Sequence, residues 1–359
     1  MSLSRKEIAP YLVGMDVSVK QAMVRLDENE QKTLFVVDPQ KRLTGALTDG
    51  DIRRWILAEG SLNDPVSRVC NRRPFSTAAD FDLDEIRQIM TKEEFGCLPV
   101  VDGDHKIVDL LFWKDVFQDG VRAAKKQLDV SAVIMAGGRG TRLDPFTRIL
   151  PKPLIPIGDK PVIEIIIDRF REHGLREFFV SVNYKSNMIK AYFDDANPDY
   201  RVHYVHEDKP LGTAGSLKLL EGRLKGSFFV SNCDILIEGD YADILAHHYA
   251  KQNDITLVAS VKNYHIPYGV CDIENGGTLM RIREKPELNF LVNTGMYILK
   301  DDTLRLIPND RLFHITDLIE AVKRDGGRVG VFPVSDRSWI DVGEWEEFKK
   351  AVKIFSSAA

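Results

Sequence analysis

Residues 133–161 read VIMAGGRGTRLDPFTRILPKPLIPIGDKP and carry the clearest structural signal in the chain. The apolar residues 132–135 predict a buried strand, which leads into the glycine-rich residues 136–141. Clustered glycines let backbone N–H groups approach an anion closely, and Arg142 and Lys152 can add positive charge for a triphosphate. The stretch therefore predicts a strand followed by a phosphate-binding loop. It matches neither the Walker motif nor the dinucleotide fingerprint, since it lacks the Lys-Ser or Lys-Thr of the first and the third glycine of the second.

Helices and strands alternate on the carboxyl side of this loop. Residues 162–173 predict an amphipathic helix, residues 177–183 a strand, residues 185–193 a helix and residues 202–206 a strand. A strand, helix, strand order implies parallel pairing, so we expect an α/β fold with a doubly wound, mostly parallel sheet. The last predicted helix, residues 342–354, closes the domain.

The loop, together with Pro151-Lys152-Pro153-Leu154 and Lys160-Pro161, resembles the signature of the sugar-1-phosphate nucleotidylyltransferases. The resemblance covers nearly all of residues 130–355. It implies a Rossmann-like nucleotidyltransferase domain that makes NDP-sugars from an NTP and a sugar 1-phosphate. The catalytic charges that it implies are Arg142, Lys152 and Lys285. The nucleotide contacts that it implies in the loop are Ala136, Gly137, Gly138, Arg139, Gly140 and Thr141.

Composition bounds the class of protein. The chain has 359 residues, of which 44% are hydrophobic and 29% charged, and this is enough for two soluble domains with their own cores. A formal net charge of −5 and the lack of a long basic stripe argue against a nucleic-acid partner. No apolar run reaches the roughly 18 residues that span a bilayer, and four scattered cysteines suggest reduced thiols. We therefore expect a cytoplasmic protein with no membrane partner.

A repeat precedes the catalytic domain. Residues 34–38 read LFVVD and residues 98–102 read LPVVD, an offset of 98 − 34 = 64 positions. Each copy predicts an amphipathic helix, a strand that ends in Val-Val-Asp, a turn, a second strand and a closing helix. The second strands are residues 43–47 and 107–111. Since one copy is too small to cover both faces of its sheet, we expect the two copies to share a core.

The repeat resembles a tandem pair of CBS domains, a module that binds adenine nucleotides between its copies. The resemblance implies that Thr48 contacts a phosphate and Asp51 the ribose hydroxyls, whereas the second copy keeps only Asp115 of this pair. We therefore expect at most one AMP or ATP site; the alternative is a packing and dimerisation module without a ligand. The resemblance also implies a homo-oligomer. The predicted organisation is a CBS pair in residues 1–122 (copies about 8–62 and 72–122), a linker in 123–129 and a nucleotidylyltransferase domain in 130–359.

Residues 207–215, which read EDKPLGTAG, lie where this family reads the nucleobase. A Pro-Leu-Gly-Thr-Ala-Gly run after an acidic residue resembles the guanylyltransferases that make GDP-mannose and related GDP-sugars. A carboxylate such as Glu207 can accept both donors of guanine, N1–H and N2–H₂. The alternative is that Glu207 is a solvated loop residue. The contacts predicted in this loop are those of Glu207, Pro210, Leu211, Gly212 and Thr213.

Two aspartates follow predicted strands that are far apart in the sequence. Asp234 ends residues 225–234, and Asp341 follows the strand of residues 329–334 and a short loop. Ligands bind at the carboxyl ends of strands in an open α/β sheet, and hard cations prefer oxygen ligands. In the family, an aspartate at the first of these positions holds Mg²⁺. We therefore expect Mg²⁺ as the cofactor, held by Asp234 and Asp341.

The sugar contacts are expected between these two aspartates in the sequence. The resemblance implies a sugar ring close to Gly269 and matches residues 284–286 to the family's Glu-Lys-Pro element. Glu284 can accept from sugar hydroxyls, and Lys285 can pair with the sugar phosphate. Asn293 and Thr294 add polar groups at a strand start. Histidines without carboxylate or cysteine companions are expected to be structural, namely His203, His206, His247 and His248.

The arrangement as a whole looks like the glucosamine-1-phosphate guanylyltransferases of bacterial legionaminic acid synthesis. It predicts transfer of NMP from an NTP, with GTP favoured, to a hexose or hexosamine 1-phosphate, with glucosamine 1-phosphate preferred. Pyrophosphate is released, and the CBS pair is a regulatory or dimerisation module. The alternatives are a mannose-1-phosphate guanylyltransferase and a uridylyl-, thymidylyl- or cytidylyltransferase. A function of another class is a sensor that binds a nucleotide sugar without turnover.

Overall fold

The computed structural model separates the chain into two compact units, residues 1–124 and 125–359. The cysteines are free thiols, as their scattered spacing predicted. Among the described residues, no helix is long and apolar enough to cross a membrane. The structure describes residues 8–29, 32–93, 95–116 and 126–356.

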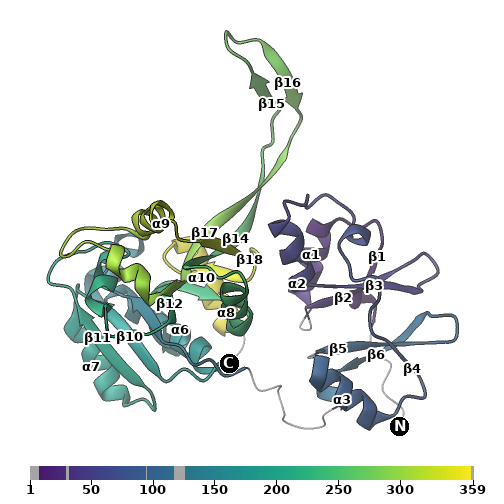
Figure 1. Ribbon diagram of the computed structural model, residues 1–359, viewed down its shortest axis with the longest axis horizontal. Coiled ribbons are helices and arrows are strands. Elements are labelled where there is room, and N and C mark those ends of the chain that lie inside the picture. Colours follow the sequence, from purple (N-terminus) through teal and green to yellow (C-terminus); the bar gives the residue numbers. More distant parts are fainter. Residues whose placement is uncertain (1–7, 30–31, 94, 117–125, 357–359) are drawn as a thin grey trace. The chain divides into compact units, whose positions relative to one another are not determined.

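The first unit contains the predicted repeat (Figure 1). The start of β5 follows that of β2 by 97 − 33 = 64 residues, and the start of β6 follows that of β3 by 107 − 43 = 64 residues, so the ungapped repeat is confirmed. The first copy consists of α1 (Val19–Glu28), β2 (Thr33–Val37), β3 (Leu43–Thr48) and α2 (Asp49–Leu57). The second copy consists of α3 (Leu83–Glu93), β5 (Cys97–Val101), β6 (Ile107–Phe112) and α4 (Trp113–Val116).

The two copies share one core. Each copy has a third strand that the sequence analysis did not predict: β1 (Leu12–Gly14) pairs in parallel with β2, and β4 (Thr77–Ala78) pairs in parallel with β5. The antiparallel pairs β2–β3 and β5–β6 contribute side chains to the same buried cluster. This is the shared core expected from the small size of one copy. Its members are Phe35, Val37, Leu43, Cys97, Val101, Ile107, Leu110 and Phe112.

The second unit is built on a seven-stranded sheet (Figure 1). All strands run in the same direction except β17, which is antiparallel to both of its neighbours. The predicted α/β fold with a mostly parallel sheet is therefore confirmed. The strand order is β11 (Arg201–His206), β10 (Glu177–Val182), β7 (Ala132–Met135), β12 (Ser227–Asn232), β17 (Glu287–Lys300), β14 (Ile255–His265) and β18 (Val329–Val334).

Helices cover both faces of this sheet. Successive residues of a strand point to opposite faces, so Ala132 and Ile134 of β7 join one core cluster while Val133 joins the other. The sheet is thus buried on both faces, which is why its strands read as continuous apolar runs. The first face is covered by α6 (Val162–Arg171), α7 (Ser186–Ala196), α8 (Tyr241–Ala250) and α10 (Trp345–Ser356). The second is covered by α9 (Ile315–Arg324) and the 3-10 segments η5 (Gly215–Leu220) and η6 (Asp301–Leu306).

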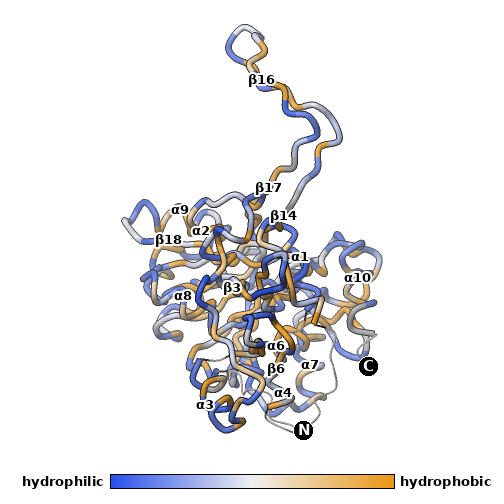
Figure 2. Tube along the Cα trace, turned by 90° about the vertical axis from the view of Figure 1, so that its right-hand side faces the viewer, coloured by the Kyte–Doolittle hydropathy of each residue, from blue (hydrophilic) through white to orange (hydrophobic). Residues whose placement is uncertain are grey.

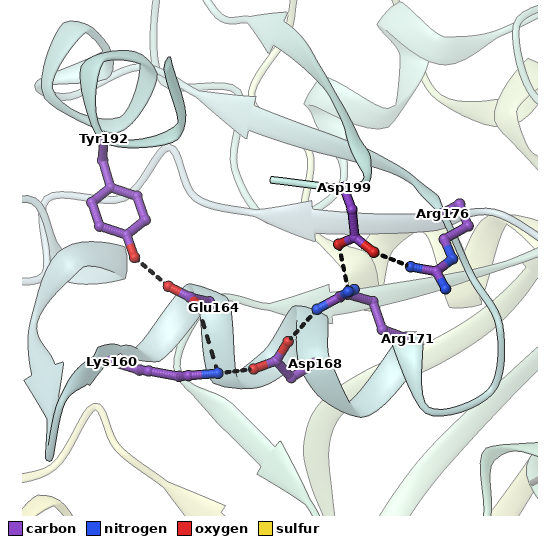
Figure 3. A network of polar contacts seen from close by, with 7 residues as sticks. All are labelled: Lys160, Glu164, Asp168, Arg171, Arg176, Tyr192 and Asp199. Atoms are coloured by element: carbon purple, nitrogen blue, oxygen red, sulfur yellow. Dashed lines mark hydrogen bonds and ion pairs between the residues drawn. The ribbon is translucent and has the colours of Figure 1, made fainter. Parts of the chain in front are cut away.

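A polar network fixes α6 to its neighbours (Figure 3). Asp168 accepts from Lys160 Nζ at 2.6 Å and from Arg171 Nη1 at 3.0 Å. Glu164 accepts from the hydroxyl of Tyr192 in α7, and burial together with this carboxylate raises the pKa of Tyr192. Single surface ion pairs stabilise little, but a network shares the entropic cost of ordering its side chains. Since Lys160 directly precedes α6, the network also anchors the segment that follows the phosphate loop.

A two-stranded arm rises from the sheet (Figure 1). β14 and β17 stay paired from Ile255 and Leu299 inside the sheet to His265 and Glu287 outside it. The antiparallel strands β15 (Val270–Ile273) and β16 (Leu279–Arg283) continue the arm to its tip. Figure 2 shows apolar segments along this arm, out to β16.

Candidate active site

The site lies at one edge of the sheet. β7, β12 and β14 run in the same direction, so their carboxyl ends meet at this edge, which is where open α/β sheets bind ligands. Met135 pairs with Asn232, so β7 and β12 end side by side. The glycine loop follows β7 and Asp234 follows β12. The topology alone therefore brings the predicted phosphate loop and the first predicted metal ligand together.

The loop has a conformation that requires glycine. Gly140 has a φ of 67°, and a Cβ there would lie 2.8 Å from the Cβ of Lys152. The loop is thus packed directly against the segment that carries Lys152, in the 3-10 turn η4 (Lys152–Leu154). Gly138, Arg139, Thr141 and Arg142 are exposed, so the loop opens to solvent. This combination is suited to binding a polyphosphate from outside.

Lys152, Asp234 and Asp341 converge on one point. The ammonium of Lys152 contacts the carboxylate of Asp234, and both side chains are almost fully buried. A Cβ at Gly343 would lie 2.5 Å from Asp234 Oδ2, 2.6 Å from Lys152 Nζ and 2.9 Å from Asp341 Oδ1. Three functional groups from distant parts of the chain therefore surround the Cα of Gly343, and only glycine leaves the space between them open.

A small two-stranded sheet brings the two aspartates together. β13 (Ile235–Ile237) pairs antiparallel with β19 (Trp339–Asp341), and Asp341 lies directly opposite Ile235. The N–H of Val342 donates to the backbone oxygen of Asp234 at 2.8 Å. Residues 339–341 are thus a strand, and α10 begins at Trp345, three residues later than the predicted start of the last helix.

The cluster brings two carboxylates and two cationic side chains together. Burial, and next the neighbouring Asp234, raise the pKa of Asp341. Arg142 hydrogen-bonds to Glu344 at 2.6 Å, which raises the pKa of Arg142, and its other terminal nitrogen lies 4.0 Å from Asp234. Two converging carboxylates supply the hard oxygen donors that Mg²⁺ prefers. In the described part of the chain, no group of three or more His, Cys, Asp or Glu residues could hold a metal ion.

Two residues of this cluster were not predicted as site residues. Gly343 lies between the charged groups, and Glu344 binds Arg142. Gly343 directly follows Asp341-Val342, and a glycine so close to a predicted metal ligand was the available signal. The pairing of Glu344 with Arg142 crosses 202 positions and had no local signal.

Glu207 is a buried residue beside the glycine loop. Its exposed fraction is 6%, so it is not the solvated loop residue that was the alternative. Ser181 donates to Oε1, and the N–H of Leu211 donates to Oε2 at 3.1 Å. A Cβ at Gly137 would lie 2.6 Å from Oε1, so the carboxylate touches the phosphate loop. Each carboxylate oxygen has a second lone pair, which leaves it able to accept from a ligand.

The rest of the predicted base loop packs against residues 311–315. Gly212 has a φ of 84°, and a Cβ there would lie 2.6 Å from the backbone oxygen of Phe313. The hydroxyl of Thr213 accepts from the N–H of Ile315 at 2.9 Å, at the start of α9. Leu211 is buried and Pro210 is exposed. Of the predicted contacts in this loop, Thr213 is thus already used in part to hold α9.

Asn293 and Thr294 lie where β17 enters the sheet at the catalytic edge. A Cβ at the adjoining Gly295 would lie 2.5 Å from Asn232 Nδ2. Asn293 donates to the hydroxyl of Tyr297 at 2.7 Å and is exposed. Thr294 is only 2% exposed and donates to the backbone oxygen of Val258, so its hydroxyl is part of the sheet.

Gly269, Glu284 and Lys285 lie on the arm. A Cβ at Gly269 would lie 3.1 Å from Glu284 Oε2, so these two predicted sugar contacts are neighbours. Lys285 precedes Thr294 by nine positions, and an extended strand rises about 3.3 Å per residue, so Lys285 lies roughly 30 Å along the arm. The structure therefore does not bring Glu284 and Lys285 to the cluster around Gly343.

The predicted nucleotide residues of the first unit are engaged with each other. Thr48 caps α2: its hydroxyl donates to Asp51 at 2.7 Å and accepts from the Asp51 N–H. Arg54 pairs with the other carboxylate oxygen of Asp51. A nucleotide bound there has to replace some of these bonds. At the corresponding position of the second copy, Phe112 is buried in the shared core, and the side chain of Asp115 lies outside the described residues.

Comparisons with known proteins agree with this organisation. A family model described as nucleotidyl transferase matches residues 131–357, and a CBS domain model matches residues 6–58 and 66–119. The chain is 29% identical over 221 residues to D-glycero-alpha-D-manno-heptose 1-phosphate guanylyltransferase of Campylobacter jejuni, covering 61% of this chain and 97% of that protein. It is 28% identical over 243 residues to UTP-glucose-1-phosphate uridylyltransferase of Synechocystis, covering 62% of this chain and 63% of that protein, which is less than two thirds of its length.

One solved structure matches the second unit in fold and in sequence. It is HddC from Yersinia pseudotuberculosis complexed with GMP-PN, with a TM-score of 0.50 and 26% identity. The match covers 63% of this chain and 99% of that one. Almost the whole of the HddC chain is thus matched, whereas only part of the present chain takes part in the match.

Proposed function

We propose that this chain, which belongs to the nucleotidyl transferase family, transfers a nucleotidyl group from an NTP to a sugar 1-phosphate and releases pyrophosphate. The observation that carries the proposal is the convergence of Lys152, Asp234 and Asp341 around Gly343, beside a glycine loop at the carboxyl edge of the sheet. Phosphoryl chemistry of this kind needs positioning and neutralisation of charge more than covalent catalysis, and this arrangement supplies both.

In the proposed reaction, an oxygen of the sugar phosphate attacks the α-phosphorus of the NTP in line. A new P–O bond forms while the bond to the β-phosphate breaks, and pyrophosphate leaves. The glycine loop and Arg142 bind the β- and γ-phosphates, and Glu344 holds the Arg142 guanidinium in place. Lys152 turns from Asp234 to the α-phosphate, where charge accumulates in the transition state. Losing one of these charges should lower the rate by about 10²–10³-fold.

We propose that Asp234 and Asp341 hold Mg²⁺. Their carboxylates point to one place, and the raised pKa of Asp341 reflects burial first and the nearby carboxylate of Asp234 second. When bound, Mg²⁺ offsets charge on the phosphates that react and leave. With a metal ion held there, Asp234 would have a second positive partner, and Lys152 would be able to turn to the α-phosphate.

We propose GTP as the nucleotide. Glu207 supports this proposal because it lies beside the glycine loop, fixed by Ser181 and Leu211, with lone pairs left for N1–H and N2–H₂ of guanine. The likeness to the Campylobacter guanylyltransferase and to the HddC complex with GMP-PN supports it as well. The Synechocystis relative is a uridylyltransferase, and a uridylyl, thymidylyl or cytidylyl enzyme is the alternative.

For the acceptor we propose glucosamine 1-phosphate, on the resemblance to the enzymes of legionaminic acid synthesis, with mannose 1-phosphate as the alternative. We propose that the first unit, which carries two CBS domain matches, is an adenine-nucleotide or dimerisation module. Thr48 and Asp51 would contact the nucleotide after giving up part of the cap of α2.

The proposal is tested by measuring pyrophosphate release. GTP, UTP, dTTP, CTP and ATP are each combined with a panel of hexose and hexosamine 1-phosphates in Mg²⁺, with and without AMP or ATP as effector. We expect turnover with GTP and an amino-sugar or mannose-type phosphate. Turnover with UTP alone would contradict the assignment of the base, and binding without turnover in any combination would make the protein a sensor.

A further inference from the structure

Among the described residues of the second unit, the arm, defined as residues 262–291, extends beyond the strands that flank it in the sheet. β18 pairs with β14 only as far as Ser260, and β12 pairs with β17 only from Met296 onward. Beyond these points, β14 and β17 pair with each other alone. A two-stranded ribbon is marginally stable in water unless its apolar side chains pack against something. We therefore expect the apolar side chains of the arm to pack against another surface.

One face of the arm's tip is apolar and the other is charged. Cys271 and Ile282 lie opposite each other on one face, whereas Asp272 pairs with Arg283 at 3.0 Å on the other. Large apolar side chains along the arm are between 44% and 74% exposed. They are Tyr264, Tyr268, Ile273, Leu279, Met280, Ile282, Phe290 and Leu291. They lie on both faces of the ribbon, since the successive residues Phe290 and Leu291 point to opposite faces. Exposed apolar side chains gathered in this number mark an interaction site.

Exposed apolar side chains also lie next to the glycine loop and next to the base loop, although the ring of Phe146 packs on that of Trp345. Phe146 and Ile149 belong to α5 (Phe146–Ile149), which directly follows the loop, and Leu312 adjoins the segment that packs on the base loop. All three side chains are exposed, and Ile149 is 74% exposed. We call Phe146, Ile149 and Leu312 the rim of the catalytic edge.

We propose that two copies of this chain exchange their arms, so that each arm completes the active site of the other copy. This inference rests on the proposed function, because that function gives Glu284 and Lys285 their roles at the sugar phosphate. The arm starts at the catalytic edge, since Thr294 and Gly295 lie there. Two such arms packed antiparallel over about 30 Å bring residues 284–285 of each to the catalytic edge of the other.

Area and continuity of pairing both favour this arrangement. When both faces of each arm are covered, the eight arm and three rim side chains of two copies amount to roughly 2,000 Å² at on the order of 100 Å² each, the size of a stable interface. The β14–β17 ladder continues without a register shift from Ala259 and Asn293 to His265 and Glu287, so that the arm leads away from its own site as one paired ribbon. Lys262 further fixes the base of the arm, because its ammonium contacts Asp336 and lies 4.9 Å from the Trp339 ring centre.

Complementation between two inactive variants tests the exchange. Asp234→Asn damages the body of the site, and Lys285→Ala damages the arm. In a heterodimer of the two variants, one site combines the intact body of one chain with the intact arm of the other. We expect each homodimer to lose at least about 10²-fold in kcat and the heterodimer, purified through two tags, to regain about half of the wild-type value. A heterodimer as inactive as the homodimers, or a protein that is monomeric at assay concentration, would overturn the proposal.

A second test does not depend on turnover. A photo-crosslinking residue replaces Ile282 in an equal mixture of ¹⁴N- and ¹⁵N-labelled full-length chains that have been unfolded and refolded together. We expect cross-links from position 282 to the rim peptides, half of them joining a light to a heavy chain. Cross-links only within one isotope, or to the first unit, would overturn the exchange. The matched control replaces Arg281, on the charged face, and should cross-link poorly. If no NTP is turned over, the proposed function is wrong. The cross-links from position 282 still show whether two copies exchange their arms.

Discussion

The ammonium of Lys152 contacts the carboxylate of Asp234, although 82 positions separate the two residues. The contact forms because β7 and β12 are adjacent and parallel, so that the segments that follow them meet at one edge. Both side chains are buried, and removing one partner of such a pair leaves a costly uncompensated charge in the other. Lys152 therefore holds the Asp234 carboxylate in place at this edge.

Gly343→Ala should inactivate the enzyme. Its Cβ would lie 2.5 Å from Asp234 Oδ2 and 2.6 Å from Lys152 Nζ, which forces these groups apart. We expect kcat to fall by about 10²-fold or more, because positioning of charge is the main source of catalysis here. Pyrophosphate release at saturating substrates measures the effect.

Gly239→Ala is the matched control for this substitution. It lies in the same unit, and its Cβ would meet only Ile237 Cγ2 at an ordinary 3.8 Å. It should keep near-normal turnover and Tm. Equal activity in the two variants would contradict the convergence around Gly343.

Asp341→Asn should stabilise the metal-free protein while it abolishes turnover. Burial and Asp234 raise the pKa of Asp341, so its ionised form destabilises the fold above that pKa. The gain in the free energy of unfolding should be full above the raised pKa of Asp341. It should vanish as the pH falls through that pKa toward the ordinary value. In EDTA we expect a higher Tm than in the wild type, with each 1 kcal/mol worth about 2–4 °C.

Adding Mg²⁺ should reverse the order of the two Tm values, so that the wild type has the higher Tm, since only the wild type keeps both carboxylates. Asp310→Asn serves as the control, because Asp310 is exposed and pairs with Lys209 on the surface. It should change neither Tm nor the response to Mg²⁺. A lower Tm for Asp341→Asn in EDTA would show that its carboxylate is already compensated in the absence of a cation.

The sequence predicted the parts of the site that are encoded locally. The glycine loop after β7 and the aspartates after apolar strands are read in short windows, and parallel topology then fixes where Asp234 lies. The burial of Glu207 had no such signal, because it stands in the polar run Glu-Asp-Lys and is covered by Ser181 and Leu211 only in the fold. The arm was missed for a similar reason. The sequence analysis did not predict β15 and β16, and that β14 extends past β18 depends on its pairing with the distant strand β17.

Glu207→Gln should weaken the selection of guanine. The amide keeps the shape of the side chain, but its NH₂ group faces one of the two donors, Ser181 or Leu211, and only its one oxygen can accept. We expect the preference of the wild type for GTP over ITP, which lacks the 2-amino group, to fall by about 10-fold or more, as a lost charge-assisted hydrogen bond implies.

The ratio of kcat/KM for GTP and ITP is the informative quantity for this variant, since a merely structural role of Glu207 would lower both values together. Asp208→Asn is the control, because Asp208 is the exposed neighbour of Glu207. It should leave the ratio unchanged. An unchanged ratio in Glu207→Gln would remove Glu207 from the recognition of the base.

Acid should destabilise the second unit through His248. The ring is fully buried between Ser227 and Thr256, with its nitrogens 3.1 and 2.8 Å from their hydroxyls, and burial lowers the pKa of His248 to about 4. In the unfolded chain His248 binds a proton below about pH 6.5, whereas in the folded unit it stays neutral until the pH approaches 4. Stability is therefore complete above pH 6.5 and falls as the pH drops toward 4, by about 2 kcal/mol at pH 5, or about 4–8 °C in Tm.

His248→Gln removes this titration and should flatten the pH dependence of Tm between pH 7.5 and 5, whatever its effect on Tm at pH 7.5. The same change at the exposed His206 should leave the slope as it is in the wild type. Because the comparison is between slopes, a loss of packing at position 248 does not obscure it. If His248→Gln and the wild type lose the same number of degrees between these two pH values, His248 is not the group whose burial makes the fold sensitive to acid.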